Sequence, residues 1–378
     1  MNRRRRPVRP STERHRRPAS DLAQAPASRA ARAVRLGSAA VVLGLVVTSL
    51  TSCAAEPAVP VEVSCLDGPG LAPAAGAAGT VAGFGVSGLR PGPVTRDYYA
   101  VTERTLVDLD DPVVDADGAL VSEATHGRGP DYHPVALAQY GLATLGSYEL
   151  TRDPEYLRRA LATATRLLEG ATVSEDGALW FAYPFEYSMH GDEAMTLEAP
   201  WYSGMAQGQG LSLFTRLAAQ TGDPVWVGAA EQTFRTFGVE RPSDDDSAPW
   251  FAHVDEAGCL WFEEYVGSVE PVQVVNGHIY ATFGLYDYAR LTSDEAAVEL
   301  FDGAATTVLQ AFGAYRAPGD VSYYCAGQYC KDQEWQPGSY HRGVVRQVET
   351  LALITSDAAF LDRATVLRTD YSESGSTD

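Results

Sequence analysis

The chain has 378 residues, 45% of them hydrophobic, which is enough for a large buried core. It carries 49 acidic and 29 basic residues, so its formal net charge is −20. A nucleic-acid-binding domain carries clustered basic charge, so this acidic composition argues against one. Lys331 is the only lysine, which leaves arginine to recognise carboxylates through paired hydrogen bonds.

The first 52 residues have the features of an export signal. Residues 1–36 hold eleven arginines, an apolar run follows at residues 39–50, and the run ends at Leu50-Thr-Ser-Cys53. These four residues resemble the bacterial lipobox, in which the cysteine is acylated and becomes the mature N-terminus. We therefore expect a lipoprotein anchored through Cys53 to the outer face of a bacterial cytoplasmic membrane. An uncleaved anchor helix is the alternative.

Composition divides the remainder of the chain into three parts. Residues 53–94 are rich in alanine, proline and glycine, which predicts a flexible tether. Residues 95–368 form the predicted folded domain. Residues 369–378 are polar and small, which predicts a disordered tail.

Four cysteines remain besides Cys53, namely Cys65, Cys259, Cys325 and Cys330. An even number in an exported protein predicts disulfides, and three pairings are available. Cys325 with Cys330 is the favoured pair because the loop between them is short. Zinc is the weaker alternative, since no histidine-rich spacing accompanies these cysteines, so we expect no metal site.

A short pattern with threonine and aspartate recurs along the domain and predicts corners between helices. Its threonines lie 70, 71 and 63 residues apart. The aspartate caps the next helix, and proline suits the first helical position. Amphipathic segments flank each corner. The four copies are Leu150-Thr-Arg-Asp-Pro154, Gln220-Thr-Gly-Asp-Pro224, Leu291-Thr-Ser-Asp-Glu295 and Ile354-Thr-Ser-Asp-Ala358.

A second repeated element lies between the helix pairs and indicates a turn followed by a short strand. It occurs at Asp117-Gly-Ala-Leu120, Asp176-Gly-Ala-Leu179 and Ala257-Gly-Cys-Leu260. Helix pairs at a regular period form a solenoid or a closed ring. Because few pairs are present, without obvious polar capping repeats, we predict a mainly α fold. It would be an (α/α) toroid or incomplete barrel of helix pairs with short β-hairpin excursions.

The first helix of each pair begins at a polar and aromatic cluster. In a ring these starts gather at one end, where exposed N–H groups and helix dipoles attract carboxylates. The alternative is that the clusters serve only as helix caps. They are Asp131-Tyr-His-Pro134, Trp201-Tyr-Ser-Gly204, Val275-Asn-Gly-His278 and Ser339-Tyr-His-Arg342.

Two carboxylates and a phenol stand within the aromatic run Trp261-Phe-Glu-Glu-Tyr265. Aromatic faces stack on sugar rings, while a carboxylate and a phenol can exchange a proton, so the run suggests carbohydrate chemistry. A half-buried strand with its acids toward water is the alternative. Strand alternation would separate Glu264 from Tyr265 and place Glu263 beside Tyr265. The strand must therefore end or bulge if Glu264 and Tyr265 serve one site.

The segment Pro200-Trp-Tyr-Ser-Gly-Met-Ala-Gln-Gly-Gln-Gly-Leu-Ser212 resembles the hallmark of the D-glucuronyl C5-epimerase family. The aromatic run at 261–265, Val275-Asn-Gly-His-Ile-Tyr280, Gly284-Leu-Tyr-Asp287 and the cluster at 339–342 follow the order of that family. The resemblance implies an isomerase that converts glucuronate to iduronate in an anionic, heparosan-like polysaccharide. It implies no redox cofactor.

Catalytic roles also follow from the resemblance. Glu264 would be the base on one face of the sugar, Tyr340 would act on the other face, and Tyr265 would support the carboxylate or relay the proton. His341 and Arg342 would assist at the start of the same helix by lowering the pKa of Tyr340.

The resemblance also implies a substrate-binding set. It comprises Trp201, Tyr202, Gln207, Gln209 and Asn276, together with His341 and Arg342. For Gln207 and Gln209, hydrogen bonding within the helix packing is an equal alternative. The usual arginine clamp for the substrate carboxylate is not matched, and Arg128 or Arg346 are the candidates to replace it.

Three other functions remain open from the sequence. A polysaccharide lyase removes the same C5 proton before the C4 oxygen leaves. A non-catalytic glycan-binding lipoprotein would keep the aromatic cleft, and a glycoside hydrolase could use the same ring of helices.

Overall fold

The computed structural model describes residues 63–68, 70–72, 80–94, 106–110, 112–122, 131–242, 248–267 and 269–371. All of them belong to one compact unit, Val59–Asp378. The predicted export signal with Cys53 lies outside the described residues, as do residues 372–378 of the predicted tail. Residues 369 and 370, predicted as the start of that disordered tail, instead end the last helix. No helix in the described part is both long and apolar enough to cross a membrane.

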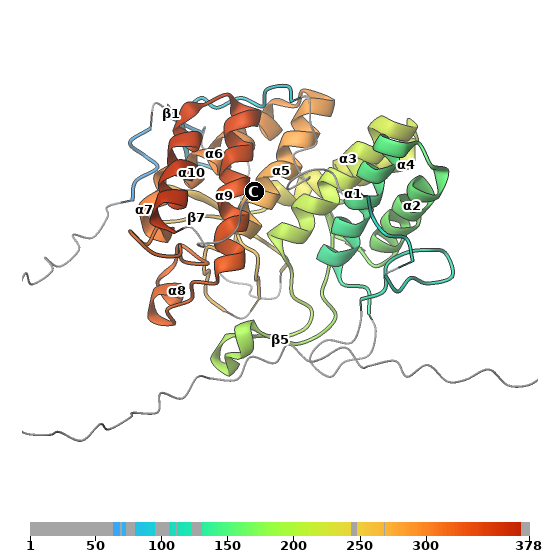
Figure 1. Cartoon of the computed structure of the whole chain (residues 1–378), viewed down its shortest axis with the longest axis horizontal. Helices are drawn as coiled ribbons and strands as arrows, with labels where there is room; N and C mark the ends of the chain where they lie inside the picture. The colour runs from blue at the N-terminus through green and yellow to red at the C-terminus, as the bar shows by residue number, and fades with distance from the viewer. Residues whose placement is uncertain are drawn as a thin grey trace, which may run out of the picture. The chain divides into compact units, whose positions relative to one another are not determined.

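Eight long helices of the described chain form four consecutive pairs (Figure 1). The first members α1, α3, α5 and α9 pack side by side in this order, and each second member packs against its partner. The pairs are α1 (Pro134–Thr151) with α2 (Pro154–Glu169), α3 (Gly204–Thr221) with α4 (Pro224–Arg235), α5 (Val275–Thr292) with α6 (Glu295–Gln310), and α9 (Gly338–Thr355) with α10 (Ala358–Asp370). Two short helices, α7 (Phe312–Tyr315) and α8 (Gln328–Asp332), connect α6 to α9.

The arrangement is an open arc of helix pairs. Helices α3 and α5 are buried on nearly all sides, while α2, α4 and α10 bury only one face. Among the described helices, α9 and α1 are not a packed pair, so the ring stays incomplete. The mainly helical (α/α) toroid class predicted from the repeats is confirmed, in its incomplete form.

The helix corners have the predicted chemistry. Thr151 Oγ1 donates to the Ser147 carbonyl at 2.8 Å and accepts the Asp153 N–H at 3.2 Å. Asp153 Oδ1 accepts the Glu155 N–H at 2.9 Å, which caps α2. A left-handed residue, Arg152 with φ of 59°, closes α1 before this cap. The same arrangement recurs at Thr221 and Asp223, at Thr292 and Asp294, and at Thr355 and Asp357.

Short antiparallel hairpins lie between helix pairs, as the second repeat predicts, with two before α3 and one before α5. A further strand pair precedes α1, and none lies between α6 and α9 in the described chain. Gly177 and Gly258, with φ of 79° and 73°, form turns in two of them, a conformation that favours glycine. The four hairpins are β1 (Gly70–Leu71) with β2 (Gly85–Val86), β3 (Thr172–Val173) with β4 (Leu179–Trp180), β5 (Tyr187–Ser188) with β6 (Thr196–Leu197), and β7 (Ala252–Val254) with β8 (Leu260–Phe262).

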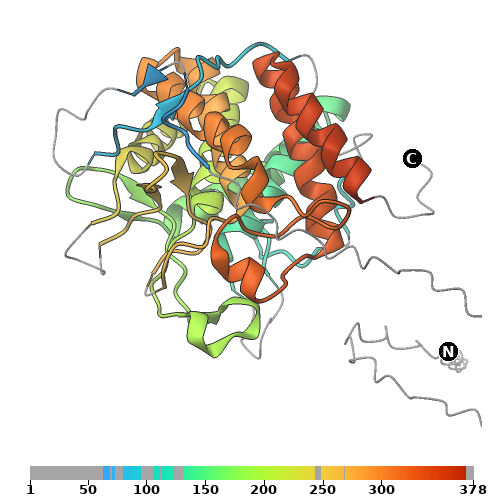
Figure 2. The same ribbon diagram turned by 90° about the vertical axis from the view of Figure 1, so that its left-hand side faces the viewer.

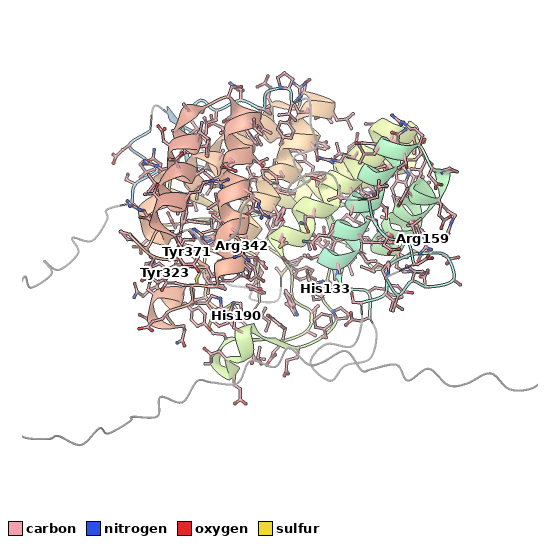
Figure 3. The ribbon with its side chains drawn as sticks, viewed as in Figure 1. His133, Arg159, His190, Tyr323, Arg342 and Tyr371 are labelled. Atoms are coloured by element: carbon pink, nitrogen blue, oxygen red, sulfur yellow. A yellow bond between two sulfur atoms is a disulfide. The ribbon has the colours of Figure 1, made fainter. Side chains whose placement is uncertain are left out.

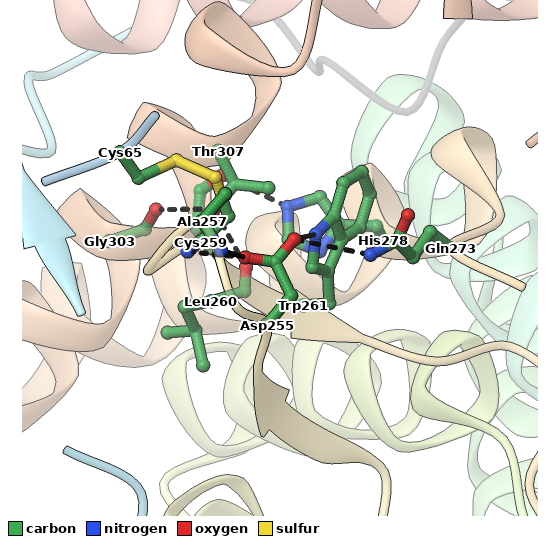
Figure 4. The surroundings of a disulfide bond; sticks show 11 residues. Cys65, Asp255, Ala257, Cys259, Leu260, Trp261, Gln273, His278, Gly303 and Thr307 are labelled. Atoms are coloured by element: carbon green, nitrogen blue, oxygen red, sulfur yellow. Dashed lines mark hydrogen bonds between the residues drawn. A yellow bond between two sulfur atoms is a disulfide. The ribbon is translucent and has the colours of Figure 1, made fainter. Parts of the chain in front are cut away.

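The described part of the predicted tether is a packed part of the domain, which corrects that prediction. Cys65 forms a disulfide with Cys259 (Figure 4). Phe84 is 2% exposed and packs against α6, where Asp302 accepts the Ser87 and Gly88 N–H groups. Figure 2 shows this N-terminal segment, in blue, against the orange helices. Composition did not predict that this segment is anchored to the domain, because only a few apolar side chains and one cysteine anchor it.

The inner helices α3 and α5 cross backbone to backbone. A Cβ atom added to Gly208 would lie 2.3 Å from the Ala281 Cα, and one added to Gly284 would lie 2.4 Å from the Gly208 carbonyl oxygen. Only glycine permits this approach. The crossing fixes the distance between two walls of the site described below.

Gly208→Ala is expected to destabilise the protein by about 2–3 kcal/mol, because the added methyl group meets main-chain atoms that cannot move separately. Urea unfolding followed by circular dichroism measures the loss. Gly228→Ala on α4 is the matched control, since a Cβ atom there meets nothing within 4 Å. It should stabilise the helix by about 0.5–1 kcal/mol. Equal effects of the two substitutions would contradict the close crossing.

Candidate active site

A cavity of about 620 Å³ opens where the inner helices begin. Each of the four polar clusters at these helix starts contributes a wall residue, namely His133, Ser203, Asn276 and Tyr340. Figure 3 shows His133, which caps α1, and Arg342 on α9 at the same end of the helices. The predicted gathering of the helix starts is therefore present in the fold.

The end of strand β8 decides which glutamate faces this cavity. β8 stops at Phe262, and the next residue, Glu263, is fully buried. Its Oε1 lies 2.8 Å from His253 Nε2, and its Oε2 accepts the N–H groups of Val272 and Gln273 at 3.2 and 3.0 Å. Glu263 therefore anchors the loop after β8.

Glu264 and Tyr265 both line the cavity, which the end of the strand permits. Gly277 in the first turn of α5 leaves room for the acid, because a Cβ atom there would lie 2.4 Å from Glu264 Oε2. This requirement explains the glycine in the Val275-Asn-Gly-His278 cluster. The geometry selects Glu264, not Glu263, as the acid of the cavity.

Burial controls the protonation of Glu264. It raises the pKa of this carboxyl from 4.5 to about 7, while hydrogen bonding to Tyr265 and Tyr324 opposes the rise and the nearby charge of Glu263 adds to it. Tyr324 donates to Glu264 Oε1 at 3.4 Å. Oε2 has no hydrogen-bond partner among the described residues. The carboxyl therefore titrates at a higher pH than an exposed glutamate does.

Three tyrosines surround this acid, and one of them was missed from the sequence. The Tyr265 and Tyr324 hydroxyls are 3.2 Å apart, and the Tyr324 ring stands perpendicular to the Tyr340 ring with centroids 4.6 Å apart. Burial raises the pKa of Tyr265 and Tyr324 well above the usual value. Tyr324 thus contacts both predicted tyrosines and the acid, and the only local signal for it was the Tyr-Tyr pair before Cys325.

The pKa of Tyr340 is raised by burial, with the charge of Glu264 as the next cause. This direction corrects the expectation that neighbouring groups lower it. All three phenols are therefore neutral hydrogen-bond donors at neutral pH.

Stacked aromatic rings form another wall of the cavity. Trp201 stacks on Tyr183 at 3.8 Å and on Tyr187 at 5.7 Å, and Tyr187 also stacks on Tyr265 at 5.7 Å. Trp201 Nε1 donates to the Phe185 carbonyl at 2.8 Å, which fixes the indole. Tyr187 belongs to the β5–β6 hairpin that projects from the helices in Figure 1. This wall suits the apolar face of a sugar ring.

Comparison with known proteins identifies the family. Residues 175–368 match the family described as D-glucuronyl C5-epimerase C-terminus, which is just over half of the chain. The chain belongs to the D-glucuronyl C5-epimerase family. The D-glucuronyl C5-epimerase of Caenorhabditis elegans is 25% identical over 195 residues, which are 52% of this chain and 30% of that protein. The match thus spans less than a third of that relative.

Solved structures give more remote similarities to this family member. Cellobiose 2-epimerase from Bacillus thermoamylovorans has a TM-score of 0.45 at 10% identity, with 72% of this chain and 70% of that chain covered. The unsaturated glucuronyl hydrolase from Bacillus sp. GL1 has a TM-score of 0.41 at 17% identity, with 62% and 61% covered.

Three residues of the family hallmark predicted to bind substrate lie outside the cavity lining. Gln207 Oε1 accepts the Phe181 N–H at 2.8 Å, and its Nε2 donates to the Leu179 carbonyl and to Thr236, so this side chain holds β4 against α3. Gln209 is buried within the same helix. Tyr202 follows Trp201 but does not share its place in the lining, and its ring packs edge-to-face with Trp180 at 5.6 Å between centroids. The alternative of hydrogen bonding within the helix packing fits Gln207, whereas Gln209 Oε1 has no hydrogen-bond partner among the described residues.

His341 and Arg342 also lie outside the lining, although they stand between two lining residues, Tyr340 and Gly343. His341 is buried and accepts the Ser322 N–H through Nδ1 at 3.0 Å, which ties α9 to the preceding loop. Arg342 is exposed on α9. Their direct contact with substrate is therefore not supported by their positions.

No arginine or lysine is found among the described residues that line the cavity of this epimerase-family chain. Arg346 is half-buried on α9, and its charge opposes the burial-driven rise in the pKa of Tyr280, a wall residue. Arg128 lies outside the described residues. Of the two candidates for a carboxylate clamp, Arg346 is the one within the described residues, and it lies near the wall.

Proposed function

We propose that this chain epimerises D-glucuronate to L-iduronate at C5 within a heparosan-like polysaccharide. The observation that supports the proposal most directly is the buried Glu264, which lines an aromatic-walled cavity together with Tyr265 and Tyr340. Tyr324 contacts all three of these residues. Family membership points to the same reaction class. A base with a pKa near 7 and several neutral phenols are suited to proton transfer at neutral pH.

The proposed reaction inverts one carbon without oxidation or reduction. Glu264 removes the C5 proton, and the C5–H electron pair passes into the adjacent carboxyl group as an enediolate. Tyr340 then donates its hydroxyl proton to the opposite face of C5, which forms the new C–H bond. Tyr324, in contact with both residues, returns the proton from protonated Glu264 to the Tyr340 phenolate, and the site is restored.

Donors at the substrate carboxylate would supply most of the stabilisation, because charge accumulates there. Helices α5 and α9 begin without a side-chain cap at Val274 and Pro337. The Val275 N–H donates to the Tyr324 carbonyl at 3.3 Å, so an anion would meet the N–H groups after Val275 in α5 and those at the start of α9. We place the carboxylate near these helix starts, with the neutral tyrosines as further donors. Arg346 would act from behind Tyr280.

The acidic protein and a polyanionic substrate repel each other at long range, but salt at physiological strength screens charges beyond about 8 Å. A lightly sulfated or unsulfated polymer therefore fits the net charge of −20 better than a heavily sulfated one. This reasoning supports heparosan-like substrates within the proposal.

Hydrogen exchange at C5 tests the proposed function. The purified protein would be incubated with heparosan, N-sulfated heparosan and chondroitin in deuterated water, and the C5 proton followed by NMR. We expect exchange without chain shortening on at least one polymer. Absorbance of an unsaturated uronate would instead identify a lyase. New reducing ends without that absorbance would identify a hydrolase, and binding without exchange would identify a glycan-binding protein.

The raised pKa of Glu264 predicts a pH dependence of both activity and stability. Exchange should increase as pH rises through about 7, because the base must be ionised. The folded pKa lies above the unfolded value of 4.5, so the contribution to stability is present below pH 4.5 and is lost as pH rises through 7. Glu264→Gln removes this titration. At pH 8 the variant should be more stable than the wild type by up to about 3 kcal/mol, and at pH 4 this advantage should disappear.

We also propose that the protein is an exported lipoprotein acylated at Cys53. The disulfides Cys65–Cys259 and Cys325–Cys330 support an oxidising compartment. Cells expressing the full chain would be labelled with radioactive palmitate and fractionated. The wild type should carry label in the membrane fraction, and Cys53→Ala should carry none; label on the variant would refute acylation at this residue.

A further inference from the structure

Tyr340, Gly343 and Gln347 lie along one face of α9, three and four residues apart, and all three line the cavity. Tyr340 is near the outside, at 41% exposed, whereas Gln347 is buried. Gly343 lies between them. This stripe defines a path along α9 from the catalytic phenol into the cavity.

Gly343 is not explained by packing. A Cβ atom there would meet nothing within 4 Å, whereas Gly208, Gly277 and Gly284 on the neighbouring inner helices each have atoms within 2.4 Å of the added position. Glycine lowers helix stability relative to alanine, and Gly343 does not have a positive φ. The absence of a side chain at this point therefore leaves space in the cavity, directly against the helix backbone.

Gln347 presents a buried acceptor beside this space. Its side chain is 5% exposed, and its Nε2 donates to the Asn276 carbonyl at 3.0 Å, which fixes the orientation of the amide. Its Oε1 has no hydrogen-bond partner among the described residues. Because an unpaired buried carbonyl is costly, this oxygen is available to a donor on a bound molecule.

We propose that Gly343 and Gln347 are specificity-determining residues, with the uronate ring lying against α9 at Gly343 and one ring hydroxyl donating to Gln347 Oε1. The identity of the ring rests on the proposed function, which this inference deepens. Gly343 selects the substrate by leaving space for the ring, and Gln347 selects it by binding one hydroxyl. Neither residue takes part in proton transfer.

Substitutions at Gly343 test whether the cavity space next to this residue is needed for binding. Gly343→Ala and Gly228→Ala make the same change in helices at positions where the methyl group meets nothing in the protein. Both should raise the melting temperature, since alanine favours the helix. Only Gly343→Ala should weaken heparosan binding, by about tenfold in calorimetry, and Gly343→Leu should abolish it. Wild-type binding by both Gly343 variants would overturn the proposal.

Substitution of Gln347 tests whether its Oε1 accepts a hydrogen bond from the substrate. Gln209 Oε1 is also buried and unpaired among the described residues, but Gln209 does not line the cavity, so Gln209→Leu is the matched control for Gln347→Leu. We expect Gln347→Leu to raise the Kd for heparosan, and the KM for exchange, about tenfold with little change in kcat. The control should leave both constants unchanged. An effect on kcat alone, or equal effects of both variants, would refute the hydroxyl contact.

Separate measurement of binding and exchange distinguishes this inference from the proposed function. A wild-type protein that binds heparosan without C5 exchange would refute the epimerase proposal, while the binding constants would still decide the roles of Gly343 and Gln347. A wild-type protein that binds neither heparosan, N-sulfated heparosan nor chondroitin would overturn both.

Discussion

Glu264→Gln is expected to lower the rate of C5 exchange by about 10³-fold, because an amide of the same shape cannot accept the proton. The cavity should otherwise persist, since an amide oxygen can still accept the hydrogen bonds from Tyr324, at 3.4 Å, and from Tyr265. Exchange would be followed by NMR in deuterated water at saturating heparosan. Calorimetry at the same pH would show whether the variant still binds.

Glu263→Gln is the matched control, with the same chemical change one residue earlier. Glu263 accepts two main-chain N–H groups and contacts His253, so this variant should lose about 2–3 kcal/mol of folding free energy. Its exchange rate should stay within about tenfold of the wild type, because the base is intact. If Glu263→Gln abolished exchange and Glu264→Gln did not, the base would be Glu263, as regular strand pairing would require.

Local chemistry explains what the sequence could predict. The corner pattern succeeded because Thr151 and Asp153 bond to main-chain groups within four residues. The gathering of helix starts followed from the period of the repeats. The exposure of Glu264 and Tyr265 to one cavity depended on a single condition, the end of the strand at Phe262.

Nonlocal contacts explain what the sequence could not predict. Tyr324 reaches Glu264 across 60 residues, and Tyr187 reaches Trp201 from a hairpin with no repeated pattern. The sequence also could not show that the side chains of Gln207 and Gln209 lie outside the cavity lining. Because α3 is buried on nearly all sides, its apolar periodicity does not show which face meets the cavity.

Removal of the Cys65–Cys259 disulfide is expected to lower the folding stability strongly. The bridge joins cysteines 194 residues apart, and chain entropy predicts a loss of about 5 kcal/mol for the Cys65→Ala, Cys259→Ala variant. The segment that carries Cys65 also loses its anchor next to β8. Equilibrium unfolding in urea, with exchange measured below the transition, separates stability from chemistry.

The Cys325–Cys330 bridge provides the contrast, because its cysteines are only 5 residues apart. The same entropy argument gives about 2 kcal/mol for its removal by Cys325→Ala, Cys330→Ala. Yet Cys325 follows Tyr324 directly, so the second variant should reduce exchange more than the first while it destabilises less. If the Cys65 and Cys259 variant instead lost exchange while it remained folded, the N-terminal segment would position the site as well as stabilise the domain.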